Sequence, residues 1–167
     1  MILLWTSVVI WMTVIFCLSG QVASKSASLS GSTVKIVIEH TQPGFRKLPV
    51  DQQNIVVTNY QHLVRKSAHF LAYTLLGILT LSALFQHSIT KGRRFAAALA
   101  ICVLYACTDE IHQLFVAGRS GQVSDVCIDA CGAFIGICAV TIIRWLMDKF
   151  RTSQDRRNRI QEHTAFQ

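Results

Sequence analysis

Four long apolar stretches, separated by short charged connections, constrain this chain more than any other feature of its sequence. They cover residues 1–18, 67–86, 94–116 and 124–147. Each is close to the ~20 residues that a helix rising ~1.5 Å per residue needs to cross ~30 Å of hydrocarbon. Since no water reaches that layer, every backbone N–H and C=O must pair within its own segment, as in a helix. The predicted fold is all-α, an integral membrane four-helix bundle, with a single membrane domain over residues 1–147.

The composition agrees with a protein whose main partner is the lipid bilayer. Of the 167 residues, 51% are hydrophobic and only 15% are charged, which excludes an ordinary soluble domain and a disordered chain. The net charge of +7 does not indicate nucleic acid, because Lys and Arg flank the apolar stretches. A signal peptide is the alternative for residues 1–18. The lack of Lys or Arg before this stretch and of an Ala-x-Ala site after it favours an uncleaved helix.

The distribution of basic residues predicts the orientation. Lys91, Arg93 and Arg94 cluster at the second connection, and the tail at 148–167 is also rich in Arg. The third connection holds only Arg119. Because short cytoplasmic loops carry an excess of Lys and Arg, both termini are expected in the cytoplasm, with the first and third connections outside.

The long first connection divides into segments of different character. Residues 19–32 are rich in Ser, Gly and Ala and are typical of a linker, and residues 33–39 are compatible with a short strand. Apolar side chains then recur at helical spacing, which predicts an amphipathic segment on the outer membrane face that leads into the second span. These side chains are Val56, Tyr60, Leu63 and Val64.

Ionisable and polar residues gather in one predicted layer of the bundle. Asp109 lies about 10 Å and Asp129 about 7 Å below the outer ends of their helices, and His69 falls in the same band. A carboxylate at mid-membrane costs about 2.5–3.5 kcal/mol, so these groups should face the bundle interior and have partners. The candidate ligand-binding residues are the cations Arg65, Lys66 and Arg119, the carboxylates Asp109, Glu110, Asp125 and Asp129, and the neutral donors His69, Tyr73 and Gln113.

The order of these residues resembles the signature of the VanZ-like family. The matching motifs are Arg65-Lys66-x-x-His69-x-x-x-Tyr73, then Asp109-Glu110-x-x-Gln113-x-Phe115, then Arg119 followed by Asp125-x-x-x-Asp129-x-x-Gly132. The resemblance implies a small multi-pass protein of the bacterial plasma membrane, from a family named for a protein that raises resistance to the glycopeptide teicoplanin. Asp129 departs from the family pattern, which usually has Asn there. A carboxylate at this position adds negative charge or a shared proton.

The favoured function is binding at the outer leaflet. A layer of Arg and Lys beside carboxylates and amides suits a cell-wall precursor, an anionic lipid headgroup or a lipophilic glycopeptide. In this hypothesis Arg65, Lys66 and Arg119 contact the anionic group. His69 and two acidic residues, Asp109 and Asp125, hold the geometry and are also the candidates for catalysis. The sequence gives no indication of the oligomeric state.

Two other classes of function stay open. An intramembrane hydrolase or transferase acting on a lipid headgroup would use His69 as base, oriented by Asp109 or Asp125. A metal-dependent variant would use His69, Glu110 and Asp125. The sequence has neither a nucleophile motif nor tight metal-ligand spacing, so neither a cofactor nor a metal is predicted. The third class is an oligomeric transporter or flippase, for which four spans are few.

Structural roles are also open for several of these residues. Asp109 could form a purely structural ion pair with Lys66 or Arg119. Gly132 and Gly136 have the small-xxx-small spacing that is typical of helix packing in membranes. His112 lies near the polar layer, and a core or surface role is favoured for it.

Overall fold

The computed structural model describes residues 2–21, 31, 34–41, 44–119 and 121–165, and its main elements are all helical. They are α1 (Ile2–Ser19), the short 3-10 helix η1 (Phe45–Lys47), α3 (Val50–Leu84), α4 (Lys91–Gln113) and α5 (Val123–Ala165). Four of them are long and apolar enough to cross a membrane: α1, α3, α4 and the part of α5 up to Gln154. The predicted all-α membrane fold is confirmed.

The connection between α1 and α3 corrects one sequence expectation. Residues 34–41 form a helix, so the short strand expected at 33–39 is wrong for those residues that the structure describes. Val34 and Ile38 lie one turn apart and pack with Phe45 in a small apolar cluster against the start of α3. Most of the predicted linker lies outside the described residues.

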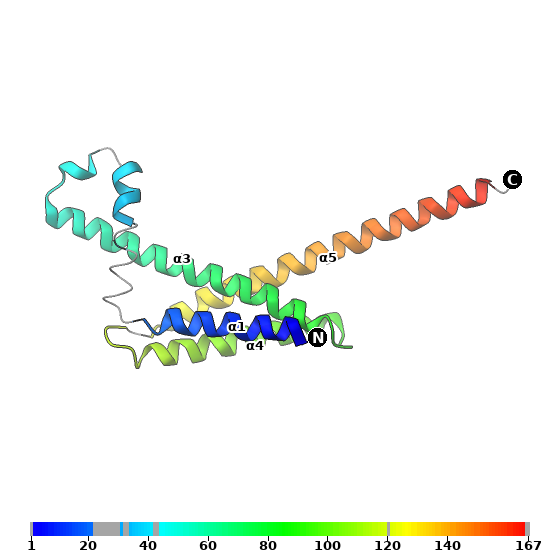
Figure 1. Cartoon of the computed structure of the whole chain (residues 1–167), viewed down its shortest axis with the longest axis horizontal. Coiled ribbons are helices and arrows are strands. Elements are labelled where there is room, and N and C mark those ends of the chain that lie inside the picture. Colours follow the sequence, from blue (N-terminus) through cyan, green and yellow to red (C-terminus); the bar gives the residue numbers. More distant parts are fainter. Residues whose placement is uncertain (1, 22–30, 32–33, 42–43, 120, 166–167) are drawn as a thin grey trace.

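Helix α3 is uninterrupted over 35 residues. At ~1.5 Å per residue it is about 52 Å long, well beyond the ~30 Å of a hydrocarbon core. The expected amphipathic segment and the second span are therefore one continuous helix, because residues 50–76 contain neither Pro nor Gly. Figure 1 shows the first half of α3 projecting beyond the other helices, with residues 34–41 and 44–47 beside it.

The crossing of α3 and α5 organises the bundle (Figure 1), and these two helices share its most extensive contact. Glycines allow their backbones to approach closely. A Cβ atom added at Gly132, Gly136 or Gly77 would meet the backbone carbonyl oxygen of Phe70, Thr74 or Ala133, respectively. The predicted packing role of Gly132 and Gly136 is therefore confirmed.

Helices α1 and α4 both contact α3. The indole N–H of Trp11 on α1 donates to the carbonyl oxygen of Ala72 at 2.8 Å, and the Tyr105 hydroxyl on α4 donates to the carbonyl oxygen of Met12. The side chains turned inward form an apolar core that includes Val8, Ile15, Tyr73, Leu76, Cys102 and Ala133. Many outward apolar side chains are exposed, as expected for helices that face lipid.

Helix α5 continues to Ala165, well past the predicted end of the fourth span at residue 147. In Figure 1 its C-terminal half extends away from the other helices. The predicted border between the membrane domain and the tail is therefore not marked by a break in the helix.

Candidate functional site

One end of the bundle, called the polar end below, brings together polar side chains from four helices. It is formed by the last turns of α1 and α4, the middle of α3, the first turns of α5 and the connection between α4 and α5. Nine of the ten predicted site residues take part in its contacts or line its cavity: Arg65, Lys66, His69, Asp109, Glu110, Gln113, Arg119, Asp125 and Asp129. The tenth, Tyr73, is fully buried one turn along α3 from His69.

Lys66 of α3 forms an ion pair with Asp125 of α5, with Nζ 2.9 Å from Oδ1. The Lys66 side chain is 36% exposed and that of Asp125 only 13%, so the pair lies at the edge of the bundle rather than in its centre. Lys66 therefore pairs with α5, and not with Asp109 of α4 as one structural hypothesis had it.

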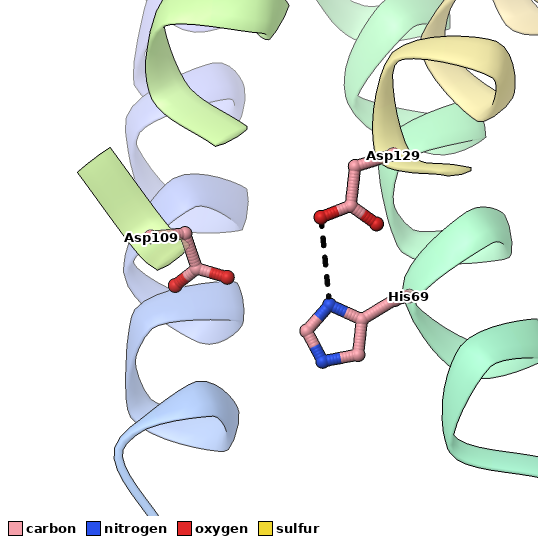
Figure 2. Close-up of side chains that lie close together, drawn as sticks. All are labelled: His69, Asp109 and Asp129. Carbon is pink, nitrogen blue, oxygen red and sulfur yellow. Dashed lines mark ion pairs between the residues drawn. The ribbon is translucent and has the colours of Figure 1, made fainter. Parts of the chain in front are cut away.

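A trio of polar side chains comes from three helices: His69 on α3, Asp109 on α4 and Asp129 on α5. The two carboxylates are almost fully buried, and the His69 side chain is 20% exposed. Figure 2 shows the imidazole and the two carboxyl groups turned toward a common space. His69 Nδ1 is 3.7 Å from Asp129 Oδ2, and one donor atom from each member lies within 4.8 Å of the others. Asp109 Oδ2 also accepts a 2.8 Å hydrogen bond from the hydroxyl of Ser19 on α1.

A chain of hydrogen bonds ties the connection between α4 and α5 to the end of α4. Glu110 accepts from the Gln113 side-chain amide at 3.2 Å and from the backbone N–H of Gln122 at 2.9 Å. Arg119 donates from Nε to the carbonyl oxygen of Gln21 at 3.1 Å, and makes a longer 3.5 Å contact with Gln113 Oε1. These bonds hold Arg119 next to the end of α1.

Arg119 lies in a crowded electrostatic environment. Burial lowers the pKa of its guanidinium from the ordinary value, and nearby Arg65 acts in the same direction, while Asp109 and Glu110 oppose the shift. An arginine stays protonated under any such influence. The polar end therefore holds two neighbouring guanidinium charges.

A cavity of about 490 Å³ opens between α1 and α3 at this end, and it is called the α1–α3 groove below. Its walls are mostly apolar, built from Trp11, Ile15, Leu18, Val64, Ala68, Leu71, Ala72 and Leu75. Arg65, Arg119 and Gln21 also line it. Ser19 and His69 belong both to the groove and to the network around the buried carboxylates.

The sequence did not reveal the contribution of α1. The Ser19 hydroxyl donates to Asp109, the Gln21 carbonyl oxygen accepts a hydrogen bond from Arg119, and Trp11 lines the groove. The sequence does not distinguish Ser19 from the other Ser and Thr residues of α1. The one signal was its position, because α1 ends at the level of the predicted polar layer. His112 stacks on Phe16 with ring centroids 4.0 Å apart, so it has a packing contact.

The residues that the sequence suggested for a metal site do not all lie together in the structure. Of the set His69, Glu110 and Asp125, only His69 lies in the compact trio. Glu110 is engaged by Gln113 and Gln122, and Asp125 by Lys66. Among the described residues, the donors close enough to share one ion are those of His69, Asp109 and Asp129.

The opposite end of the bundle has a second cavity of about 530 Å³ between the α3–α4 connection and α5. Arg94 and Arg144 both lie over the ring of Phe85, at 4.5 and 3.7 Å from its centroid. Arg94 also donates to the carbonyl oxygens of His87 and Ile89. Arg94 lies in the first turn of α4, and Arg144 lies near the middle of α5.

Comparison with known proteins adds one finding. The family model described as VanZ/LLP1 matches residues 4–144, a range that includes nearly all of α1, all of α3 and α4, and the membrane part of α5 up to that point. No curated protein and no solved structure matches the chain.

Proposed function

The chain belongs to the VanZ/LLP1 family, and on that premise we propose that it binds a phosphate-bearing amphiphile of the bacterial envelope in the α1–α3 groove. The observation that carries the proposal is the composition of this groove. Its apolar walls lead to two arginines and to His69, one member of the polar trio. An amphiphile has the same arrangement, with a long apolar chain joined to an anionic headgroup.

The apolar part of the groove suits a lipid chain. Its volume of about 490 Å³ falls in the range of ~300–1,000 Å³ that is typical of small-molecule sites. Trp11 and Leu75 mark its deep end, and Arg65 and Arg119 line the end near the α4–α5 connection. A chain entering sideways from the bilayer would exchange lipid contacts for contacts with these walls.

The two arginines supply recognition of phosphate. A guanidinium presents a planar fork of N–H donors that matches two phosphate oxygens at once. The described contacts of Arg119 use only part of its donors, and Arg65 lines the same cavity. An anion placed between two like charges also relieves their mutual repulsion, which favours binding over an empty site.

The distribution of basic residues supports an outer-leaflet location. Lys91, Arg93 and Arg94 lie at the opposite end of the bundle, where the positive-inside rule predicts the cytoplasm of a bacterial cell. The groove then opens to the outer leaflet, where lipid-linked cell-wall precursors expose their phosphates and sugars.

Native mass spectrometry from lipid nanodiscs tests the proposal. The discs contain phosphatidylethanolamine with a small fraction of either undecaprenyl phosphate or the neutral alcohol undecaprenol. We expect retained adducts of the phosphate and few of the alcohol. The double variant Arg65→Gln/Arg119→Gln should lose at least about tenfold of the adduct, since charge-assisted hydrogen bonds contribute about 1.5–3 kcal/mol each.

Arg93→Gln serves as the matched control, because Arg93 is an exposed arginine at the opposite end of the bundle. It should retain the adduct at the level of the unaltered protein. Equal retention of alcohol and phosphate, or undiminished phosphate binding by the double variant, would refute the proposed site. Phosphatidylglycerol in a third set of discs separates a specific isoprenoid lipid from any anionic lipid.

The same groove supports a role in glycopeptide resistance. A lipophilic glycopeptide and a lipid-linked precursor both present an apolar chain beside polar groups. We expect expression in a susceptible bacterium to raise the inhibitory concentration of teicoplanin more than that of a glycopeptide without a lipid chain. The double arginine variant, expressed at the same membrane level, should remove the difference.

The second candidate function is that of an intramembrane hydrolase that acts on the same class of phosphate-bearing lipid. His69 lines the groove and its Nδ1 faces the Asp129 carboxylate, an arrangement that orients an imidazole as general base. Release of inorganic phosphate from undecaprenyl phosphate by the purified protein, lost in His69→Gln, would establish catalysis in place of simple binding.

A further inference from the structure

The His69, Asp109 and Asp129 trio has a property that the proposed lipid site does not use. Each member comes from a different helix, so the three donors meet only because α3, α4 and α5 pack together. Asp129 is 0% exposed and Asp109 only 1%. Figure 2 shows all three side chains directed at one space.

Several carboxylate oxygens of the trio have no hydrogen-bond partner among the described residues. They are Asp109 Oδ1 and both oxygens of Asp129. Asp129 Oδ2 has only the 3.7 Å ion-pair contact with His69, and Asp109 Oδ2 is satisfied by Ser19. Buried polar atoms are nearly always paired, and a buried charge without a partner is strongly unfavourable.

Neither Lys66 nor Arg119 forms an ion pair with the trio in the described part of the chain. Lys66 lies 2.9 Å from Asp125, and Arg119 bonds Gln21 and contacts Gln113. His69 can contribute at most one positive charge against the two carboxylates of the trio. Glu110 adds further negative charge close by. The trio therefore has donors and negative charge in excess of its protein partners.

We propose that His69, Asp109 and Asp129 bind a divalent metal ion. One imidazole nitrogen and two carboxylate oxygens form a mixed donor set, which suits Mn²⁺ or Zn²⁺. Mg²⁺ and Ca²⁺ prefer sites made of oxygen donors alone. Donors on one such ion lie at most about 4.2 Å apart, twice a typical bond of about 2.1 Å. The three donor atoms lie within 4.8 Å of one another, so small side-chain rotations would bring them to the spacing of about 4.2 Å that one ion requires.

Metal binding here goes beyond the proposed lipid site and does not depend on it. Three protein donors leave coordination positions for water or for another oxygen ligand. Because His69 and Ser19 also line the α1–α3 groove, those positions lie close to the place proposed for a phosphate. The competing explanation is a proton shared between the two carboxylates, which needs no metal.

A titration with Mn²⁺ followed by electron paramagnetic resonance distinguishes these explanations. The protein is purified in detergent through a tag that contains no histidine, stripped with chelator and titrated with Mn²⁺ in the absence of added lipid. We expect about one Mn²⁺ bound per chain, competition by Zn²⁺, and a rise in thermal stability on loading. Coupling of the bound Mn²⁺ to a histidine nitrogen should also be detected.

The variants Asp109→Asn, Asp129→Asn and His69→Gln should each weaken Mn²⁺ binding at least about tenfold, because even outer-shell partners of a metal typically contribute 10- to 100-fold. His69→Gln should also abolish the nitrogen coupling. Asp148→Asn, an exposed change on the same helix as Asp129, and His62→Gln, an exposed change on the same helix as His69, are the matched controls and should retain both signals.

Absence of Mn²⁺ and Zn²⁺ binding by the unaltered protein would overturn the proposal in favour of the shared proton. So would nitrogen coupling that survives in His69→Gln, because the ion would then lie elsewhere. If the carboxylate variants fail to fold, the stoichiometry, the thermal shift and the coupling in the unaltered protein still decide the question. Failure of the lipid assay leaves this test unaffected.

Discussion

Ser19 and Asp109 stand 90 positions apart in the chain, and the Ser19 hydroxyl donates a 2.8 Å hydrogen bond to Asp109 Oδ2. Ser19 is the last residue of α1, and Asp109 lies near the end of α4. Each is 1% exposed. This bond joins the first helix to the polar end and gives a buried carboxylate one of the partners that it needs.

We therefore expect Ser19→Ala to lower the free energy of unfolding by about 1–3 kcal/mol. The substitution leaves a buried acceptor unsatisfied, and the desolvation cost of that group is then no longer offset. Chemical denaturation in detergent micelles, followed by circular dichroism, measures the change.

Ser7→Ala is the matched control on the same helix. The Ser7 hydroxyl donates to the carbonyl oxygen of Leu3, a bond local to α1, so its loss should change the free energy of unfolding by less than about 0.5 kcal/mol. If the two variants are equally stable, the bond between Ser19 and Asp109 does not support the bundle.

The sequence was sufficient to predict the helices and the gathering of charge at one end. Apolar runs of membrane length have one stable backbone form, and residues such as Asp125 and Asp129 share a helical face by spacing alone. It was not sufficient to pair the groups across helices. That pairing depends on how far each helix is rotated and where it crosses its neighbour, which is set by backbone contacts at Gly77, Gly132 and Gly136.

The limits of the helices differ from the limits of the predicted spans for a related reason. The amphipathic residues before the second span suggested a separate surface helix, yet the chain has no Pro or Gly there to end one and start another. The fourth helix likewise continues into a tail rich in good helix formers. The hydropathy of a segment predicts the limits of the membrane span, but it does not predict where the helix itself begins or ends.

A second prediction concerns the crossing of α3 and α5. Gly132→Ala should lower the free energy of unfolding by about 1–3 kcal/mol, because the added Cβ meets the backbone carbonyl oxygen of Phe70, and a backbone cannot move aside as a side chain can. Thermal unfolding in micelles measures the loss. Gly92→Ala is the control, since a Cβ there has nothing within 4 Å. It should leave stability unchanged or slightly higher, and an equal loss in both variants would contradict the crossing.

A third prediction compares two ion pairs of equal length in different surroundings. Lys66–Asp125 and Arg46–Glu39 both measure 2.9 Å, but the Lys66 and Asp125 side chains are 36% and 13% exposed, whereas those of Arg46 and Glu39 are 74% and 22% exposed. Double-mutant cycles with Gln and Asn substitutions should give a coupling energy of about 1–3 kcal/mol for the first pair and at most about 1 kcal/mol for the second.

The same two pairs should respond differently to salt. Raising the ionic strength screens exposed charges more than partly buried ones, so the coupling of Arg46 with Glu39 should fall while that of Lys66 with Asp125 changes little. Equal couplings, or equal loss with salt, would show that Lys66 and Asp125 are fully solvated and that the polar end is open to water at this position.

The fourth prediction is the orientation of the polar end. In a variant whose six native cysteines are replaced, Ala117→Cys in the α4–α5 connection should react with a membrane-impermeant maleimide added to intact cells. Ser88→Cys in the α3–α4 connection should react only after the cells are opened. Both positions are exposed in the structure, so their reactivity reports the side of the membrane.

The physical reason for the expected labelling pattern is the positive-inside rule: Lys91, Arg93 and Arg94 adjoin Ser88, whereas only Arg119 adjoins Ala117. The reverse labelling pattern would place the α1–α3 groove in the inner leaflet, and its ligand would then have to be a lipid of the cytoplasmic face.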